Sequence, residues 1–484
     1  MQIQSANPVM RQAALPVLAV DLDGTLLKTD VLLECLIDLL RRRPWYIFLL
    51  PFWWLKGTAH LKHQIARRTA LDLTVLPYRE DFIAYLKTRR AQGGSLVLAT
   101  AADFEIAKRV ADYLGLFDEV LASDGVTNLN RGAKRERLVR EFGEKGFDYA
   151  GNSNRELPVW AAGRHAIVVD SNLRLAARVK RVAEIDHVFR NGRARFADLL
   201  IALRPQHWVK NLLLFVPLIA AHRISEFHLW SKLVLAFFAF GCVASSGYLI
   251  NDLHDLTADR RHPHKRFRAF ASGNLPLSYA LAMIPILLGL ACAIGTQVSG
   301  LFVASVATYF GLSLAYSLWV RRILILDVIF LAGLYTVRIL AGSSAVAIWP
   351  SHWLLAFSTF LFFSLALVKR YGELCVMKHA DGDHATARAY ELTDAELLAA
   401  MGVASGYLAV LVLALYINSD KAPMLYGRYQ LIWLLCPLLL YWISDIWLIA
   451  HRGKMPDDPV VFAMKNRTSR ILLLAMFAIC VFAL

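Results

Sequence analysis

The chain has 484 residues, of which 57% are hydrophobic, and its mean hydropathy of +0.45 excludes an ordinary soluble protein of this size. The formal net charge is +15, but the lysines and arginines cluster in loops between apolar runs, which favours a membrane protein with anionic substrates and no nucleic acid partner. The six cysteines are scattered singly without a CxxC pair, so their pattern indicates neither a disulfide framework nor a zinc site.

Residues 1–195 have the mixed pattern of a globular domain, in which apolar strands alternate with helical patterns. The expected strands include LPVLAV, SLVLAT, DEVLAS, FDYAGN and AIVVD, and the expected helices include EIAKRVADYLG and KRERLVREFG. This alternation predicts a doubly wound α/β domain. At the end of a parallel strand, Asp21 and Asp23 of VDLDGT would project into the crevice where such sheets bind ligands.

A DxDGT motif after an apolar strand resembles the haloacid dehalogenase (HAD) superfamily of phosphatases, and the resemblance covers about residues 15–190. It implies that Asp21 is the nucleophile, which forms an aspartyl-phosphate, and that Asp23 is the acid that protonates the leaving oxygen. It also implies that Thr100 is the phosphate-binding hydroxyl and that Lys134 steadies the phosphoryl charge.

The fourth motif of that superfamily, GDxxxD, is present here as GNSNRE, with Asn152 and Glu156 in place of aspartates. Asparagine still offers an oxygen ligand, but a Mg²⁺ site made by Asp21, Asp23 and Asn152 has one negative charge fewer, which weakens metal binding. Two interpretations follow. The domain is either an active but weak phosphatase or a catalytically inactive cap or scaffold.

An insertion at about residues 28–90 stands where a helical cap is expected. It contains RRRPWYIFLLPFWWLKG, residues 41–57, whose apolar part is too short to span a bilayer and is interrupted by Pro51. Trp and Tyr beside basic residues are typical of a segment that lies in the membrane interface. The alternative is a cap that packs only on its own domain.

Residues 196–484 contain nine apolar stretches of about the length that a membrane-spanning helix requires. They lie near 206–222, 229–251, 275–295, 298–319, 323–344, 352–372, 397–418, 429–450 and 470–484. The loops after the second, fourth, sixth and eighth are basic, whereas the opposite loops carry almost no positive charge. The positive-inside rule therefore predicts a protein of the bacterial inner (plasma) membrane, with the N-terminal domain and both predicted active sites in the cytoplasm.

The second of these helices runs into NDLHDLTADRRHPHKRFR, residues 251–268, here called the acidic segment. Asp252, Asp255 and Asp259 are spaced i, i+3 and i+7, so a continuing helix places them on one face. Like charges this close need a cation, and hard carboxylate oxygens suit Mg²⁺ that shares its shell with substrate phosphates. We expect Asp252 and Asp255 to hold the metal. The residues expected to contact the substrate are Asn251, Asp259, His262, Lys265, Arg266 and Arg268.

NDLHDLTADRRHPHKRF resembles the NDxxDxxxD motif of the UbiA superfamily of intramembrane prenyltransferases, and the resemblance covers about residues 200–484. It implies nine membrane helices and a site for Mg²⁺-diphosphate. Members usually carry a second motif, DxxxD, after the fourth helix. This chain has Asp327, but Leu331 stands four residues later. The departure argues against an ordinary prenyl diphosphate donor.

Four further stretches resemble the decaprenyl-phosphate phosphoribosyltransferase branch of that superfamily: LRPQHWVKNLLLFVPL, DVIFLAGLYTVRILAG, VKRYGELCVMK and DDPVVFAMKNR. The resemblance implies that the Mg²⁺-bound diphosphate belongs to phosphoribosyl pyrophosphate and that the acceptor is a polyprenyl phosphate in the bilayer. The anionic acceptor needs no strong base, so the site chiefly needs groups that hold two phosphorylated substrates. The candidates are Lys210, Asn211, Asp327, Arg338, Lys369 and Arg370.

Arg338 follows Asp327 by 11 residues, about 16 Å along a helix, at a depth where an unpaired cation marks a functional site. The alternative for Arg338 is a structural pair with an internal carboxylate. The two predicted domains suggest consecutive steps. The membrane domain would make a polyprenyl-phosphoryl 5-phosphoribose, and the HAD-like domain would remove its 5-phosphate. The alternative function is prenyl transfer to an aromatic acceptor, with a non-catalytic HAD-like scaffold.

Overall fold

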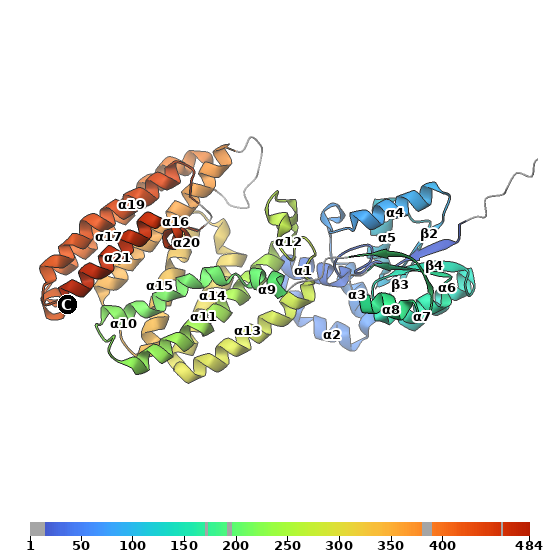
Figure 1. Ribbon diagram of the computed structural model, residues 1–484, viewed down its shortest axis with the longest axis horizontal. Helices are drawn as coiled ribbons and strands as arrows, with labels where there is room; N and C mark the ends of the chain where they lie inside the picture. The colour runs from blue at the N-terminus through green and yellow to red at the C-terminus, as the bar shows by residue number, and fades with distance from the viewer. Residues whose placement is uncertain (1–14, 170–172, 191–195, 380–389, 456–457) are drawn as a thin grey trace, which may run out of the picture. The chain divides into compact units, whose positions relative to one another are not determined.

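The computed structural model describes residues 15–169, 173–190, 196–379, 390–455 and 458–484 (Figure 1). The chain divides into two compact units. The α/β unit consists of Met1–Ala202 and Ile250–Ala282, and the helical unit consists of Leu203–Leu249 and Met283–Leu484. The acidic segment therefore groups with the N-terminal α/β fold.

The α/β unit is built on a parallel six-stranded sheet in the order β3-β2-β1-β4-β5-β6. Its strands are β1 (Val17–Val20), β2 (Leu96–Asp103), β3 (Glu119–Ser123), β4 (Phe147–Gly151), β5 (His165–Val169) and β6 (Glu184–Phe189). The five expected strands and the parallel sheet with its helices are confirmed, and β1 lies inside the sheet. The sixth strand was missed, because only Phe189 of EIDHVF is buried.

Helices cover both faces of this sheet. They are α4 (Glu80–Ala91) and α5 (Phe104–Leu114) on one face, and α6 (Arg131–Phe142), α7 (Leu157–Ala162) and α8 (Leu173–Val179) on the other. Alternate residues of each strand point to opposite faces. In β1, Leu18 and Val20 therefore join the core under α4 and α5, while Ala19 joins the core under α6 and α7. Burial on both faces explains why the strands read as continuous apolar runs.

Five short helices form a cap between β1 and α4: α1 (Val31–Arg42), η1 (Pro44–Phe48), α2 (Leu50–Leu55), α3 (Thr58–Ala66) and η2 (Leu73–Val75), where η denotes a 3₁₀ helix. Asp30 caps α1 by accepting a hydrogen bond from the Leu33 amide. Pro51 lies in the first turn of α2, where its missing N–H is tolerated. The unit also holds η3 (Asn154–Glu156), α9 (Phe196–Leu203), α12 (Leu256–Arg261) and η5 (Lys265–Phe267).

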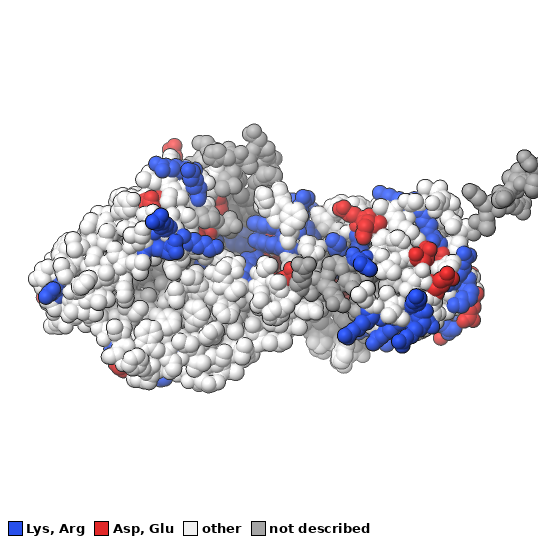
Figure 2. Space-filling model, viewed as in Figure 1, with Lys and Arg blue, Asp and Glu red and all other residues white. Residues whose placement is uncertain are grey.

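Seven helices of the described residues are long and apolar enough to cross a membrane. They are α11 (Phe227–His254), α13 (Leu277–Val298), α14 (Gly300–Leu318) with η6 (Val320–Arg322), α15 (Leu326–Val346), α16 (His352–His379), α17 (Ala395–Ile417) with η7 (Leu392–Asp394), and α19 (Leu435–His451) with η8 (Tyr429–Leu434). In the view of Figure 2, most of the visible surface of the helical unit carries no charged side chain. Such a surface suits contact with lipid.

Two of the nine predicted spans take other forms. The stretch at 206–222 forms a 3₁₀ helix, η4 (Pro205–Phe215), and a short helix, α10 (Val216–Ala220), with a proline at the start of each. Near the C-terminus, α20 (Pro459–Lys465) and α21 (Arg467–Ala483) are bent by 80°. Asn466 causes this break, because its side chain caps α21 by accepting from the Ser469 amide. The described chain thus holds seven candidate spans, or eight if the bent pair is one. A last short helix is α18 (Lys421–Leu425).

Candidate active sites

The first candidate site lies at the carboxyl ends of β1, β2 and β4. Asp21 directly follows β1, and its Oδ1 accepts a 2.7 Å hydrogen bond from Nζ of Lys134 in α6. The same Nζ donates to the hydroxyl of Tyr149 in β4 at 3.0 Å. All three residues are buried. The structure thus brings together the carboxylate and the lysine that the sequence placed 113 residues apart.

Burial sets the protonation of the two aspartates in this site. It raises the pKa of Asp21 to about 7, with the Lys134 charge opposing the rise. It also raises the pKa of Asp23 well above its ordinary value, and Asp30 and Asp21 add to that effect. Oδ1 of Asp23 accepts from the Val31 amide at 2.8 Å, which ties it to the start of α1. A carboxyl group whose pKa is raised suits a general acid, and one beside a lysine suits a nucleophile.

Thr100 lies in β2 and Asn152 follows β4, the two strands that flank β1. Thr100 is fully buried in β2, and its hydroxyl oxygen accepts from the Ala102 amide at 3.1 Å. Asn152 follows β4 and packs against Gly24, where a Cβ would lie 1.9 Å from the Asn152 side-chain nitrogen. Gly24 also has φ +73°, which residues other than glycine rarely adopt. A larger residue would therefore both clash with Asn152 and strain the backbone. The buried hydroxyl of Thr25 has no hydrogen-bond partner among the described residues.

Glu156 has a role that the sequence reasoning missed. One of its oxygens accepts from the amides of Asn152 and Ser153, at 2.9 and 3.1 Å. The other accepts from the Tyr149 hydroxyl at 2.5 Å and lies 3.5 Å from Nζ of Lys134. Glu156 therefore fixes the loop after β4 and adds negative charge beside Lys134. The S-x-x-E spacing of Ser153 and Glu156 is a capping box and could have revealed the loop contact.

The acidic segment forms the second candidate site. Asp252 and Asp259 are buried, and Nη1 of Arg268 lies 2.7 Å from Oδ2 of Asp259 and 3.5 Å from Oδ1 of Asp252. Asp255 stands between α11 and α12, and its Oδ1 pairs with Nδ1 of His254 at 3.1 Å. Lys265 and Arg266 are exposed, and Asn251 lies in the last turn of α11.

A guanidinium thus bridges Asp252, which was expected to hold a metal, and Asp259, which was expected to contact the substrate. Among the residues that the structure describes, no three His, Cys, Asp or Glu side chains are grouped closely enough to hold a metal ion. The donor types still fit Mg²⁺, since Asp252 and Asp255 offer carboxylate oxygens and substrate phosphates complete such shells. In the α/β site, Asp21, Asp23 and Asn152 likewise present oxygen donors at one edge of the sheet.

The helical unit encloses a cluster of buried polar side chains from distant segments. Lys210 of η4 forms an ion pair with Asp458, and both side chains are buried. Arg338 of α15 donates to the Tyr309 hydroxyl and the Leu334 carbonyl, each at 2.7 Å.

Further contacts complete this cluster. Nε of Arg338 lies 3.4 Å from Oδ1 of Asn211, and its guanidinium is 4.6 Å from the centre of the Tyr309 ring. Lys369 is close enough to Asp458 to interact with it electrostatically. The alternative considered for Arg338 was a structural pair with an internal carboxylate. Among the described residues, Arg338 contacts no carboxylate. Asp458 and Tyr309 were not singled out from the sequence.

Asp327 and Arg370 are buried together in a separate network. Nε of Arg370 donates to Oδ2 of Asp327 at 2.5 Å, and the Tyr390 hydroxyl donates to its Oδ1 at 2.6 Å. Arg370 also contacts Glu373 at 3.0 Å and the Tyr316 hydroxyl at 2.6 Å. Both oxygens of Asp327 therefore already have partners inside the protein.

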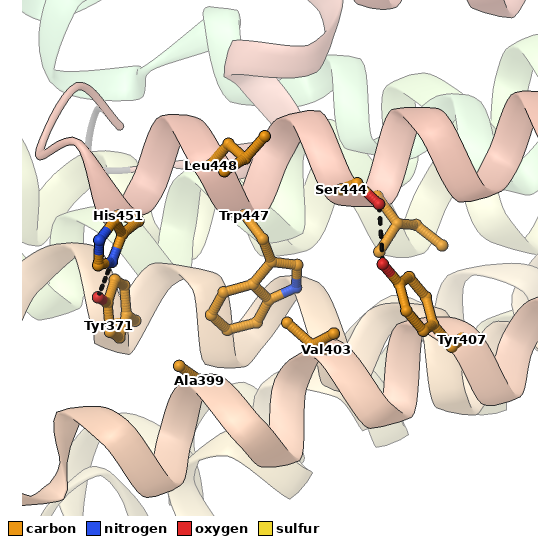
Figure 3. A pocket seen from close by; sticks show the side chains of 9 residues that line it. Tyr371, Ala399, Val403, Tyr407, Ser444, Trp447, Leu448 and His451 are labelled. Atoms are coloured by element: carbon orange, nitrogen blue, oxygen red, sulfur yellow. Dashed lines mark hydrogen bonds between the residues drawn. The ribbon is translucent and has the colours of Figure 1, made fainter.

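A groove of about 340 Å³ lies between α16, α17 and α19 (Figure 3). At one end the Tyr371 hydroxyl meets Nδ1 of His451 at 2.8 Å, and at the other the Tyr407 hydroxyl meets Oγ of Ser444 at 2.9 Å. Apolar side chains and Trp447 line it between these pairs. Tyr371 directly follows Arg370, but the groove contains none of the predicted site residues.

Long apolar helices that enclose buried lysine, arginine and aspartate side chains define a multi-pass integral membrane protein with an internal polar site. The UbiA prenyltransferase family matches residues 212–467, and the chain belongs to this family. It is therefore an integral membrane protein of a transferase family.

Three relatives show how far the similarity extends. An uncharacterized protein, y4nM, of Sinorhizobium fredii is 35% identical over 93% of this chain and 87% of its own length. Nodulation protein NoeC of Azorhizobium caulinodans is 39% identical over 57% of this chain and 89% of its own. Decaprenyl-phosphate phosphoribosyltransferase of Mycolicibacterium smegmatis is 30% identical over 58% of this chain and 90% of its own.

Proposed function

We propose that this protein transfers 5-phosphoribose from phosphoribosyl pyrophosphate to a polyprenyl phosphate in the bilayer, with release of pyrophosphate. The names of the decaprenyl-phosphate phosphoribosyltransferase relatives support this donor and acceptor. The observation that carries the proposal concerns Asp327 and Leu331, which stand where the second motif, DxxxD, is expected. Asp327 is engaged by Arg370 and Tyr390, and Leu331 is apolar. The second aspartate-rich motif expected for a prenyl diphosphate is therefore missing.

In this reaction a phosphate oxygen of the lipid attacks the anomeric carbon of the ribose, and the bond from that carbon to pyrophosphate breaks. The nucleophile is already anionic, so no proton has to be removed. Asp252 and Asp255 would hold a Mg²⁺ ion, which would neutralise the charge that develops on the leaving pyrophosphate. Arg338 and Lys210 would hold the phosphate of the acceptor, because a buried guanidinium that meets no carboxylate among the described residues is a strong site for an anion.

For the α/β unit we propose an HAD-type phosphatase that removes the 5-phosphate from the lipid product and leaves polyprenyl-phosphoryl ribose. A carboxylate oxygen of Asp21 attacks phosphorus, the bond to the ribose 5-oxygen breaks, and Asp23 protonates that oxygen. Water then hydrolyses the aspartyl-phosphate. Lys134, 2.7 Å from Asp21, would stabilise the phosphoryl charge. Asp21, Asp23 and Asn152 would hold Mg²⁺. The basic loops predict that both sites face the cytoplasm at the bacterial inner membrane.

The test uses purified full-length protein with Mg²⁺, a polyprenyl phosphate and phosphoribosyl pyrophosphate labelled in the ribose. Lipid products with and without the 5-phosphate are separated for the wild type, Asp21→Asn and Asp252→Ala. We expect the wild type to give the dephosphorylated lipid, Asp21→Asn to stop at the phosphorylated lipid, and Asp252→Ala to label neither. If the wild type also stops at the phosphorylated lipid, the phosphatase proposal is wrong and the α/β unit is a scaffold.

Prenyl transfer to an aromatic acceptor is the second candidate, and the description of the matching family as prenyltransferases favours the prenyl transfer. The two functions differ in their donor. If ribose label never enters lipid and geranyl diphosphate, but not phosphoribosyl pyrophosphate, protects the protein against heat, the phosphoribosyl proposal is wrong. Protection by phosphoribosyl pyrophosphate that is lost in Asp252→Ala would support it.

A further inference from the structure

The cap carries an apolar surface that neither candidate site uses. We call residues 44–55, which form η1 and α2, the cap segment. Tyr46, Leu50 and Trp53 face inward and pack on the core of the α/β unit. Its other large apolar side chains are between 41% and 75% exposed: Trp45, Ile47, Phe48, Leu49, Phe52, Trp54 and Leu55. A contiguous patch of this kind on a protein surface marks an interaction site.

Charge at the borders of the cap segment points to the kind of partner. Arg43 precedes it and Lys56 follows it, and both are exposed. The guanidinium of Arg68 lies 5.1 Å from the centre of the Trp53 ring, on the same part of the cap. Aromatic side chains flanked by cations are typical of segments in the headgroup region of a bilayer, where the cations meet anionic lipids.

The cap is also held to α12, the short helix that follows α11. Glu34 of α1 accepts hydrogen bonds of 2.6 and 3.1 Å from the guanidinium of Arg260, and both side chains are buried. Arg260 comes six residues after His254, where α11 ends. At 1.5 Å per residue, the helical rise, these six residues cover about 9 Å. Glu34 and Pro44 are ten residues apart, or about 15 Å along α1. Through this pair, short stretches of chain connect the cap segment to the end of α11.

A second contact ties the cap to the chain that leads into α13. A Cβ at Gly273 would lie 2.8 Å from Cβ of Lys28 and 3.3 Å from Pro77, and Gly273 is four residues before the start of α13. Arg261 also forms an ion pair with Asp72 of the cap. The cap thus contacts the chain both where it leaves α11 and where it enters α13.

We propose that the cap segment lies in the headgroup region of the bilayer that α11 and α13 cross, with Phe48, Phe52 and neighbouring apolar side chains inserted toward the acyl chains. The segment has too few residues to span the bilayer, so it lies along the surface. An extension of this inference rests on the proposed function. The docked cap, joined to Asp23 through the Val31 amide, selects phosphate esters carried on lipids.

The docking is tested on full-length protein in vesicles of phosphatidylethanolamine and phosphatidylglycerol. The six native cysteines are replaced, and a single cysteine at Phe48 or Phe52 carries an environment-sensitive fluorophore. The control is a cysteine at Leu173 of α8, which is 71% exposed in the same unit. We expect a quencher on the lipid acyl chains to quench the labels at 48 and 52, and iodide to quench the label at 173.

Two outcomes would overturn the docking proposal. If the labels at 48 and 52 behave like the label at 173, the segment faces water. If both quenchers fail at 48 and 52, protein covers the segment, either a second copy or another part of the chain.

The extension is tested with the variant Phe48→Ser/Phe52→Ser. We expect phosphate release from the lipid product to fall roughly tenfold, because membrane binding scales with buried apolar area. Hydrolysis of p-nitrophenyl phosphate, a soluble ester, should be unchanged. An equal loss on both substrates contradicts lipid selection by the docked cap. If the wild type hydrolyses neither substrate, the proposed phosphatase function fails, while the quenching result still decides the docking.

Discussion

Two of the buried cations of the helical unit, Lys210 and Arg338, are balanced in different ways. Lys210 forms an ion pair with the carboxylate of Asp458. Arg338 instead contacts the Tyr309 hydroxyl and ring, the Leu334 carbonyl and the side-chain oxygen of Asn211. A guanidinium that is buried, and whose partners among the described residues are all neutral, keeps most of its attraction for an anion. We therefore place the phosphate of the acceptor chiefly at Arg338, with Lys210, which Asp458 positions, as a second contact.

Replacing Arg338 by lysine tests this assignment. Lysine keeps the charge but cannot serve the Tyr309 hydroxyl, the Leu334 carbonyl and Asn211 together, because it lacks the planar fork. We expect KM for the polyprenyl phosphate to rise about tenfold or more, with a smaller change in KM for phosphoribosyl pyrophosphate. Steady-state kinetics with each substrate varied in turn makes the measurement. A variant with unchanged KM values and only a lower melting temperature contradicts the assignment.

The Lys210–Asp458 pair calls for a double-mutant cycle. Lys210→Met or Asp458→Asn alone leaves one buried charge without its partner, so each should lower the free energy of unfolding by about 3–5 kcal/mol. The double variant has neither charge, and we expect it to recover most of the stability in a detergent thermal melt. Transfer activity should stay low in all three, because Lys210 also contributes to phosphate binding. Full activity in the double variant would reduce the pair to a structural role.

At the scale of elements, one glycine sets how closely α15 approaches η4. A Cβ at Gly342 would lie 2.1 Å from the Leu214 carbonyl oxygen, whereas a Cβ at Gly333 on the same helix meets no atom within 4 Å. Alanine favours a helix over glycine by about 1 kcal/mol at either position, so the two variants differ mainly in the clash. We expect Gly342→Ala to lower the melting temperature and transfer activity and Gly333→Ala to preserve both. Equal melting temperatures would contradict the close approach.

The sequence predicted elements well where one local pattern decides them. Asp21 was placed correctly at the end of a strand, because an apolar run before DxDGT requires one. The stretch at 206–222 was predicted as one helix, since its composition is apolar, yet Pro205 and Pro217 start two short elements. The acidic segment was predicted to gather three carboxylates, but Arg268 bridges only Asp252 and Asp259. A guanidinium that folds back over its own segment leaves no periodic signal.

Contacts between distant segments could not be predicted from the sequence either, because they leave no periodic signal. Lys210 and Asp458 are 248 residues apart, and Asp327 meets Tyr390 across 63 residues. No local pattern specifies either pair. Lys134 and Asp21 are also distant, but a family resemblance gave both a role, and the sheet then brings them to 2.7 Å.

At the scale of the whole molecule, composition and contacts divide the chain differently. Composition suggests a boundary at 195/196, whereas contacts group Ile250–Ala282 with Met1–Ala202. The helices α11 and α13 therefore each begin in one unit and end in the other. Because the acidic segment packs on the cap, the cap is expected to influence the proposed transfer reaction as well as the proposed phosphatase reaction.

The Glu34–Arg260 pair provides the test of this coupling. Arg260 lies in α12 beside Asp259, so loss of its partner should let the acidic segment move. We expect Glu34→Gln to reduce kcat/KM for phosphoribosyl transfer roughly fivefold, about 1 kcal/mol, as for other couplings carried by a packed network. Arg261→Gln is the matched control, because Arg261 pairs with Asp72 at an exposed position, where an ion pair contributes less than about 1 kcal/mol. Its transfer activity should stay near that of the wild type. In the charge exchange Glu34→Arg/Arg260→Glu, the pair is rebuilt in reverse, and recovery of transfer activity would show that the interaction itself positions the acidic segment. If Glu34→Gln lowers stability but leaves kcat/KM for transfer unchanged, the cap only anchors the α/β unit and does not act on the transfer site.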